Sequence, residues 1–217
     1  MFFHRIWTCN EFTGFFEIHQ IIKTMQALTV FCGANTGSDP VYTEVARQMG
    51  HLLASEGIAL VYGGGKVGLM GVIADAVLEK GGKVIGVIPH FLAHKEVEHT
   101  GVTEMHYSET MHERKMKMFE LSDGAIAMPG GFGTLDELFE LCTWAQLGHH
   151  EKPLAILNVN GFYDTLLQFL NRVVSDGFLK IENRGIILDA AQPTEVLKKM
   201  RNYQPVHVPK WIRKEDI

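Results

Sequence analysis

Two glycine-rich segments of this 217-residue chain have the composition of anion-binding loops. Residues 63–71 read GGGKVGLMG, and residues 129–134 read PGGFGT. Each follows a short apolar run typical of a buried strand and precedes a segment with helical periodicity. Glycines let the backbone approach an anion closely, and the N-terminus of a following helix offers N–H groups without intrahelical partners. Together, the two segments predict a site for a phosphate group.

Other kinds of nucleotide site fit these glycines less well. Gly63, Gly65 and Gly68 satisfy the spacing GxGxxG, but a dinucleotide site also needs an acidic residue at the end of the next strand. That strand ends at Pro89 and His90, so an NAD-dependent oxidoreductase is the weaker alternative. The chain has no glycine followed by Lys and then Ser or Thr, as a Walker A loop requires. Tight turns without a ligand are the plainest alternative for either segment.

Arg114 stands on the apolar side of a predicted helix. With Met111 at 0° and about 100° per residue, Arg114 falls near ~300°, between Leu121 at ~280° and Met118 at ~340°. An arginine on this face needs a partner or a wet cleft, because an unpaired buried charge is costly. Arg114 is therefore a candidate for a functional site. The alternatives are a snorkelling side chain at the edge of the face and a structural ion pair.

Glu137 lies three residues after Thr134, directly behind the second glycine segment. This spacing matches a capping box, in which Thr134 caps the helix and the Glu137 carboxylate bonds back to the helix start. A carboxylate in the first turn beside an anion-binding loop is also placed for acid–base chemistry on a bound ligand. The two roles are compatible, and we favour the functional one.

Several histidines raise the question of a metal. His90, His94 and His99 fall on a predicted loop, and His149 and His150 are adjacent. The first group lacks the ligand spacing of a known zinc site. We therefore expect no metal, and we interpret these histidines as exposed or as lying at the edge of a substrate.

The elements that position these residues alternate regularly along the chain. Short, continuous apolar runs predict strands, and the segments between them predict amphipathic helices, which together indicate a mostly parallel sheet covered on both faces. Asp39 and Pro40 match a helix cap and a first helical turn. We predict one Rossmann-like three-layer α/β domain over residues 25–217, with strands at 27–32, 58–62, 83–88, 103–107, 124–128, 154–157 and 186–188 and helices at 40–55, 68–80, 109–122, from just after 130–133 to about 147, 162–176 and 193–201. Such sheets bind ligands beyond the carboxyl ends of their strands, where both glycine segments fall.

The composition indicates a cytoplasmic globular protein. The net charge is −5 without a basic stripe, so we expect no nucleic-acid partner. Three scattered cysteines favour a reducing compartment, and no apolar run approaches the ~20 residues of a membrane span. Residues 1–24 lack a lasting period. We interpret them as an N-terminal extension, with an extra helix or strand packed on the domain as the alternative.

Three motifs in this order resemble the Lonely Guy family: GGGxxGLMG at 63–71, Met111-His112-x-Arg114-Lys115, and PGGxGTxxE at 129–137. The resemblance covers roughly residues 28–211. Members are cytokinin riboside 5′-monophosphate phosphoribohydrolases, once labelled lysine decarboxylases. The resemblance implies cleavage of the base–sugar bond of a nucleoside 5′-monophosphate, with Arg114 and Glu137 as the catalytic residues. It further implies that the nucleotide is contacted by Gly63, Gly64, Gly65, Gly68, Met70, Glu96, Lys115, Gly130, Gly131, Phe132, Gly133, Thr134, Leu135, Asp136 and Thr143.

The resemblance also bears on cofactors and partners. We expect no cofactor: pyridoxal phosphate chemistry would need a Schiff-base lysine and a partner for the pyridinium nitrogen, and no residue pattern suggests either. A non-catalytic nucleotide or cofactor carrier of Rossmann type is the main alternative, although a carrier has no need of Arg114 together with Glu137. We expect a small-molecule ligand and a homodimer or larger even assembly, with apolar surface for a partner copy at Trp144, Leu147 and Phe162.

Overall fold

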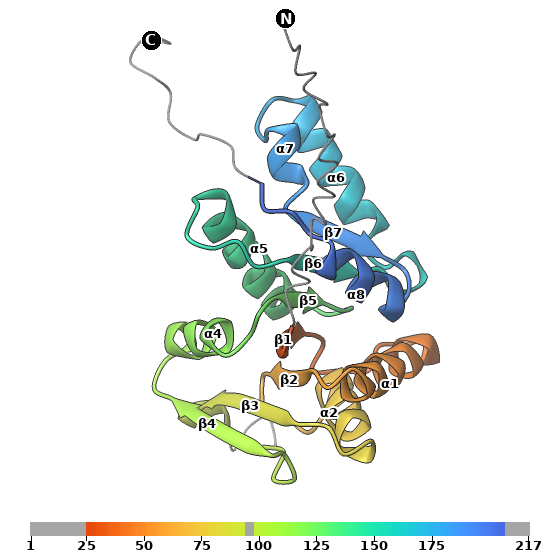
Figure 1. Ribbon diagram of the computed structural model, residues 1–217, viewed down its shortest axis with the longest axis vertical. Coiled ribbons are helices and arrows are strands. Elements are labelled where there is room, and N and C mark those ends of the chain that lie inside the picture. Colours follow the sequence, from red (N-terminus) through yellow and green to blue (C-terminus); the bar gives the residue numbers. More distant parts are fainter. Residues whose placement is uncertain (1–24, 94–97, 207–217) are drawn as a thin grey trace, which may run out of the picture.

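Seven parallel strands form the sheet at the centre of the described chain (Figure 1). This computed structural model describes residues 25–93 and 98–206. The strands are β1 (Ala27–Phe31), β2 (Ala59–Tyr62), β3 (Val84–Pro89), β4 (Glu104–Ser108), β5 (Ala125–Ala127), β6 (Leu154–Leu157) and β7 (Ile187–Ala190). They lie in the order β4-β3-β2-β1-β5-β6-β7, and every neighbouring pair is parallel. The predicted parallel α/β fold is confirmed.

Helices cover both faces of this sheet. On one face, α1, α2 and α8 pack against side chains such as Leu28, Val30 and Leu60. On the other face, α4, α5 and α6 pack against Phe31, Val61 and their neighbours. The helices are α1 (Pro40–Ser55), α2 (Gly68–Glu79), α3 (His90–Ala93), α4 (Met111–Glu120), α5 (Phe132–Gln146), α6 (Asp164–Ser175), α7 (Ile181–Arg184) and α8 (Pro193–Arg201), with a 3-10 turn η1 (Val159–Gly161) before α6.

The central strands are almost entirely apolar because both of their faces are buried. All five residues of β1 are buried, with Leu28 and Val30 on one face and Ala27 and Phe31 on the other. A strand covered on both sides reads as a continuous apolar run rather than as an alternating one. This is why the sequence located β1 but carried no sign of which face each side chain would take.

The chain changes direction between β1 and its neighbour β5. The register pairs Val30 with Ile126, so the two strands end side by side. After β1 the chain enters α1 on one face, and after β5 it enters α5 on the opposite face. Diverging loops at such a switch point leave a crevice beyond the carboxyl ends of the strands, where ligands of this fold class bind. The second glycine segment therefore lies at the edge of the crevice.

Helix boundaries differ from the prediction mainly near turns. The cap of α1 is as predicted: the Val41 N–H donates to Asp39 Oδ1 at 2.9 Å, and Pro40 opens the helix. The predicted helix from residue 162 starts instead at Asp164, because η1 precedes it. The sequence analysis missed α3 and α7, each of four residues. One-turn helices carry too few residues to show a period.

The interpretation of residues 1–24 as an extension lies outside the described residues and stays a prediction. Directly after these residues, the chain is hydrogen-bonded to Asp123: the N–H groups of Gln26 and Ala27 donate to Asp123 Oδ2 at 2.7 and 3.1 Å. We expect deletion of residues 1–24 to change the melting temperature by less than about 2 °C. A deletion through Leu28 removes these bonds and part of β1, and as the control it should lower the melting temperature strongly. A large loss from the shorter deletion would show that the extension belongs to the core.

No helix in the described ranges combines the length and the apolar character needed to cross a membrane.

Candidate active site

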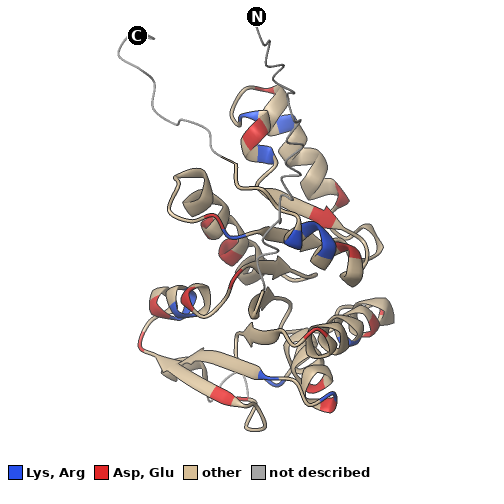
Figure 2. Cartoon of the chain, in the orientation of Figure 1, with Lys and Arg blue, Asp and Glu red and all other residues tan. Residues whose placement is uncertain are grey.

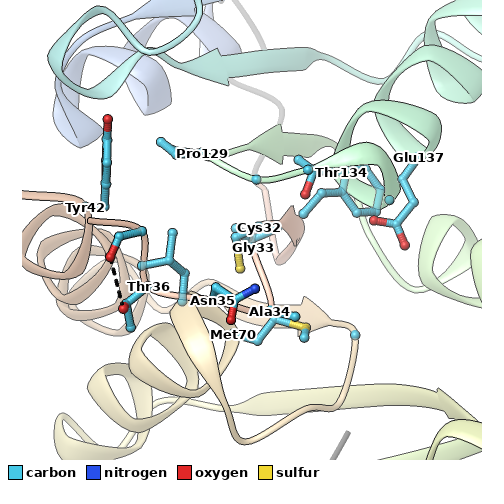
Figure 3. A pocket seen from close by; sticks show the side chains of 18 of the residues that line it. Cys32, Gly33, Ala34, Asn35, Thr36, Tyr42, Met70, Pro129, Thr134 and Glu137 are labelled. Atoms are coloured by element: carbon cyan, nitrogen blue, oxygen red, sulfur yellow. Dashed lines mark hydrogen bonds between the residues drawn. The ribbon is translucent and has the colours of Figure 1, made fainter. Parts of the chain in front are cut away.

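A cavity of about 410 Å³ opens at the switch point between β1 and β5 (Figure 3). Three loops at the carboxyl edge of the sheet form it, following β1, β2 and β5, and the chain before α6 closes one side. Its lining comprises Val30, Phe31, Cys32, Gly33, Ala34, Asn35, Thr36, Gly37, Tyr42, Gly63, Leu69, Met70, Arg114, Met118, Pro129, Gly130, Gly131, Gly133, Thr134, Glu137 and Phe162. Arg114 and Glu137 are the charged side chains in this lining.

Arg114 reaches the cavity from the N-terminal turn of α4. Thr110 caps this helix by accepting the Glu113 N–H at 3.1 Å. The residue is only 7% exposed, and its guanidinium is held by the backbone: Nε donates to the Val87 carbonyl at 3.1 Å and Nη2 to the Gly63 carbonyl at 3.3 Å. Two of its three nitrogens are therefore fixed. The snorkelling alternative is excluded, because the head group is buried with its stem.

The third nitrogen of Arg114 faces Glu137. Nη1 lies 3.7 Å from Glu137 Oε1, and the two side chains are 9% and 11% exposed. Glu137 projects from α5, whereas Arg114 projects from α4, so the pair joins two helices across the cavity wall. The ion-pair alternative for Arg114 is thus present, but the pair lines the cavity rather than the protein interior. A carboxylate and a fixed guanidinium beside an open space are suited to stabilising charge on a bound ligand.

The predicted capping box is absent from α5. The helix begins at Phe132 with Gly131 as its cap, three residues earlier than the motif requires, and no side chain caps it. Thr134 is consequently the third helical residue, and Glu137 lies one turn farther along. The start of α5 is set by tight packing, because a Cβ on Gly130 would lie 2.2 Å from Thr134 Oγ1. The structure removes this alternative role for Glu137.

The second glycine segment lines the cavity through Gly130, Gly131, Gly133 and Thr134. It ends in the N-terminus of α5, whose first N–H groups have no intrahelical partner. Thr134 is only 4% exposed, and it lines the cavity. A hydroxyl beside free N–H groups at a helix N-terminus is suited to an anion such as a phosphate.

The first glycine segment contributes to the cavity through Gly63 and Met70. Its other predicted glycines have packing roles. Gly64, with φ +80°, lies against Ile88, and Gly65 bridges to Glu98. Gly68, with φ +67°, abuts the backbone of Ala34, where a Cβ would lie 2.2 Å from the carbonyl carbon.

Several residues that the resemblance implied lie outside the cavity lining. Lys115 points toward α5, where Nζ pairs with Glu140 at 2.8 Å and Asp136 at 3.2 Å (Figure 2 shows both charge signs on α4). Burial opposes its charge, but the bonds to these two carboxylates outweigh it and raise the pKa of Lys115. Three further residues lie outside the lining: Phe132, Leu135 and Thr143. Phe132 is 93% exposed, and the Thr143 hydroxyl donates to the Phe139 carbonyl. Glu96 lies outside the described residues. A nucleotide contact at any of these residues stays a prediction.

The β1–α1 loop, residues 33–37, was missed as part of the site. Asn35 and Thr36 line the cavity opposite Thr134, together with Tyr42 of α1 (Figure 3). The loop contains two glycines that flank polar residues, but only the adjacency of β1 and β5 shows that it lies at the switch point. Cys32, at the end of β1, also lines the cavity. Burial and then the nearby Glu137 carboxylate raise the pKa of its thiol, so it is neutral.

The histidines form no metal site in the described chain. No group of three or more His, Cys, Asp and Glu side chains there is placed to hold an ion. His99 is buried, with Nε2 2.9 Å from Asp75 Oδ1. His90 stacks on Tyr107 at 5.1 Å between ring centroids. His94 lies outside the described residues.

An all-parallel sheet with a glycine-lined crevice at its switch point defines a Rossmann-like α/β protein. The family model described as "Possible lysine decarboxylase" matches residues 70–200. Among curated proteins, the chain is 48% identical to the probable cytokinin riboside 5′-monophosphate phosphoribohydrolase LOGL1 of Oryza sativa subsp. japonica, covering 83% of this chain and 81% of that one. It is 45% identical to LOG1 of Arabidopsis thaliana, a protein with the same activity in its name, covering 87% and 88%. The chain belongs to this family, the Lonely Guy family, and the resemblance is confirmed.

Solved structures share the fold at lower identity. The molybdenum cofactor binding protein of Rippkaea orientalis superposes with a TM-score of 0.62 at 23% identity, covering 82% of this chain and 96% of that one. A Moco carrier protein from Chlamydomonas reinhardtii gives a TM-score of 0.62 at 20% identity, with the same coverage. These likenesses concern the fold alone.

Proposed function

We propose that this chain hydrolyses the N-glycosidic bond of adenosine 5′-monophosphate or its N6-modified forms, releasing the free base and ribose 5-phosphate. The names of its relatives support this activity. The structural observation that carries the proposal is the Arg114–Glu137 pair, which lines a nucleotide-sized cavity one helical turn from a glycine-flanked helix N-terminus.

The spacing along α5 suits a nucleoside monophosphate. Thr134 and Glu137 are three residues apart, a rise of about 4.5 Å along the helix. A phosphate on the N–H groups of residues 130–134 therefore holds the sugar beside Glu137. The reaction breaks the bond between C1′ and the base nitrogen, while water supplies a hydroxyl group to C1′ and a proton to the base. Because such cleavage passes through an oxocarbenium-like sugar, the Glu137 carboxylate stabilises that cation, activates the water, or does both.

Arg114 complements this carboxylate. Its bonds to the Gly63 and Val87 carbonyls fix the guanidinium plane before substrate arrives, so little reorganisation is needed during the reaction. From this position it orients Glu137 and the nucleotide, and it stabilises negative charge that develops on the departing base or on a phosphate oxygen.

Neither a decarboxylase nor a carrier explains this arrangement as well. No lysine lines the cavity, and Lys115 is engaged by Asp136 and Glu140, so no described lysine there is placed to form a Schiff base. A carrier needs to hold its ligand without attacking it. A fixed guanidinium beside a carboxylate at the sugar position is a feature of turnover rather than of storage.

The test is a panel of nucleotides assayed for release of free base by chromatography. AMP and N6-prenyl AMP should both yield base, and their relative kcat/KM values identify the preferred substrate. Tight binding of AMP without any release of base would support the carrier instead.

Gly63→Ala should disable the site without touching a catalytic side chain. A Cβ at this position would lie 2.1 Å from Arg114 Nη2, so the guanidinium must move. We expect kcat/KM to fall by roughly 10- to 100-fold, since a misplaced electrostatic group loses much of its effect. The control is the double variant with Arg114→Ala, in which Gly63→Ala should add little, because the two changes act on one group. Fully additive losses would contradict this account of Gly63.

We also propose that the chain forms a homodimer or a larger even assembly. Phe162 lines the cavity, which leaves Leu147, 43% exposed, and the half-buried Trp144, packed on Phe119, as the apolar surface near the end of α5. Light scattering at micromolar concentration should give at least twice the chain mass, and Leu147→Glu should lower it. Ile181→Glu, at an exposed residue of α7, is the matched control and should not lower the mass. A monomeric wild type would end the proposal.

A reducing, cytoplasmic setting is part of the same proposal. It is supported by Cys32 and Cys142, which are both free thiols.

A further inference from the structure

The cavity has two ends of different chemistry. Glu137 and Arg114 form one end, and Tyr42 and Phe162 form the other, with Pro129 and the β1–α1 loop between them (Figure 3 shows Tyr42 and Glu137 on opposite sides). Since the scissile bond belongs beside Glu137, the 5′ end of a bound nucleotide points toward the aromatic end. The composition of that end therefore decides what can follow the first phosphate.

Neutral donors surround the middle of the cavity. The Thr134 hydroxyl and the Asn35 amide belong to side chains that line the cavity. The Asn35 loop is held in place, because the Gly33 N–H donates to the Pro129 carbonyl at 3.0 Å and the Gly33 carbonyl accepts the Leu69 N–H at 3.0 Å. These groups can hold one phosphate together with the N-terminus of α5.

The aromatic end is a firmly supported wall. Tyr42 and Phe162 meet edge to face at 5.8 Å between ring centroids, and Phe162 packs on Tyr163 at 4.8 Å. The Tyr163 hydroxyl donates to the Met128 carbonyl at 2.7 Å, directly before the glycine segment. The turn before Phe162 is also tied to the cap of α1, because Asn160 Nδ2 donates to the Asp39 carboxylate at 3.4 Å.

We propose that Tyr42 and Phe162 are specificity-determining residues that close the cavity after a single phosphate group and exclude nucleoside di- and triphosphates. This inference rests on the proposed hydrolase function. A second phosphate would meet two aromatic rings, and no lysine or arginine among the described residues lines this end to neutralise it. Desolvating such a charge without a partner is costly.

The experiment compares adenine release from AMP and ADP by the full chain, using kcat/KM for each. The wild type should prefer AMP strongly. In Phe162→Ala the preference should fall by roughly 10-fold or more, as expected when one wall of a specificity pocket is removed. Phe162→Tyr should keep the preference. Phe169→Ala, which removes an exposed ring on α6 outside the cavity, is the matched control and should match the wild type.

Tyr42→Leu removes the other aromatic ring at this end of the cavity, and it serves as a second test in case Phe162→Ala perturbs folding. The proposal is overturned if both variants fold, as judged by their melting curves, and retain the wild-type ratio of AMP to ADP. This outcome differs from a failure of the proposed hydrolase function, because in that case the wild type would release no adenine from AMP.

Discussion

Glu137→Gln and Arg114→Ala will each lower kcat for base release by at least about two orders of magnitude. Removing a positioned acid–base or electrostatic group typically costs about 10²- to 10⁴-fold in rate. Glu137→Gln keeps the size of the side chain and removes its charge, so its effect isolates the carboxylate. Arg114→Lys should not restore activity, because a lysine keeps the charge but cannot bind the Gly63 and Val87 carbonyls while also facing Glu137.

Steady-state kinetics and thermal melting check this expectation together. Arg114→Ala leaves two buried carbonyls without their donor, at a cost of roughly 1–3 kcal/mol each, so a lower melting temperature is expected for that variant. Glu120→Gln and Arg47→Ala change the same residue types on exposed helix faces and should retain full activity. Near-wild-type turnover in Glu137→Gln or in Arg114→Ala would refute the role assigned to that residue.

AMP will be a far better substrate than adenosine. A phosphate at the N-terminus of α5 gains charge-assisted hydrogen bonds, each worth about 1.5–3 kcal/mol. Two net bonds imply a preference of about 10²- to 10⁴-fold in kcat/KM. ATP should be a poor substrate, because the chain lacks a P-loop lysine. Arg114 faces Glu137, and Lys115 pairs with the carboxylates of α5. We therefore expect the phosphate to be bound mainly by neutral donors.

Thr134→Val gives a matched test of the phosphate site. The substitution removes the buried hydroxyl and keeps the shape, so it should weaken catalysis with AMP while changing the slow reaction with adenosine little. Thr165→Val on the exposed side of α6 is the control. Equal kcat/KM values for AMP and adenosine in the wild type would show that the glycine segment does not hold the substrate's phosphate.

The sequence predicted the succession of elements because buried strands and amphipathic helices leave local patterns. It held no local signal for strand order. The adjacency of β1 and β5, separated by about a hundred residues, arises from crossovers and creates the cavity. For the same reason, Asn35 and Tyr42 could not be assigned to the site from their own neighbourhoods. They become part of it only because β5 ends beside β1.

The individual site residues show the same limit. Helical periodicity placed Arg114 on a buried face, and burial there is confirmed. Periodicity could not supply Gly63, Val87 and Glu137 as its partners, since these come from three other elements. The Thr134–Glu137 spacing fitted a capping box equally well, whereas the helix in the structure starts three residues earlier, with Gly131 as its cap.

The most direct measurement is incubation of the full chain with AMP, followed by chromatography of all products. The account predicts adenine and ribose 5-phosphate in equal amounts, with no adenosine and no inorganic phosphate, and predicts that Glu137→Gln abolishes both products. Adenosine with inorganic phosphate would show that the cavity cleaves the phosphate ester instead. AMP recovered intact after prolonged incubation would contradict the hydrolase assignment.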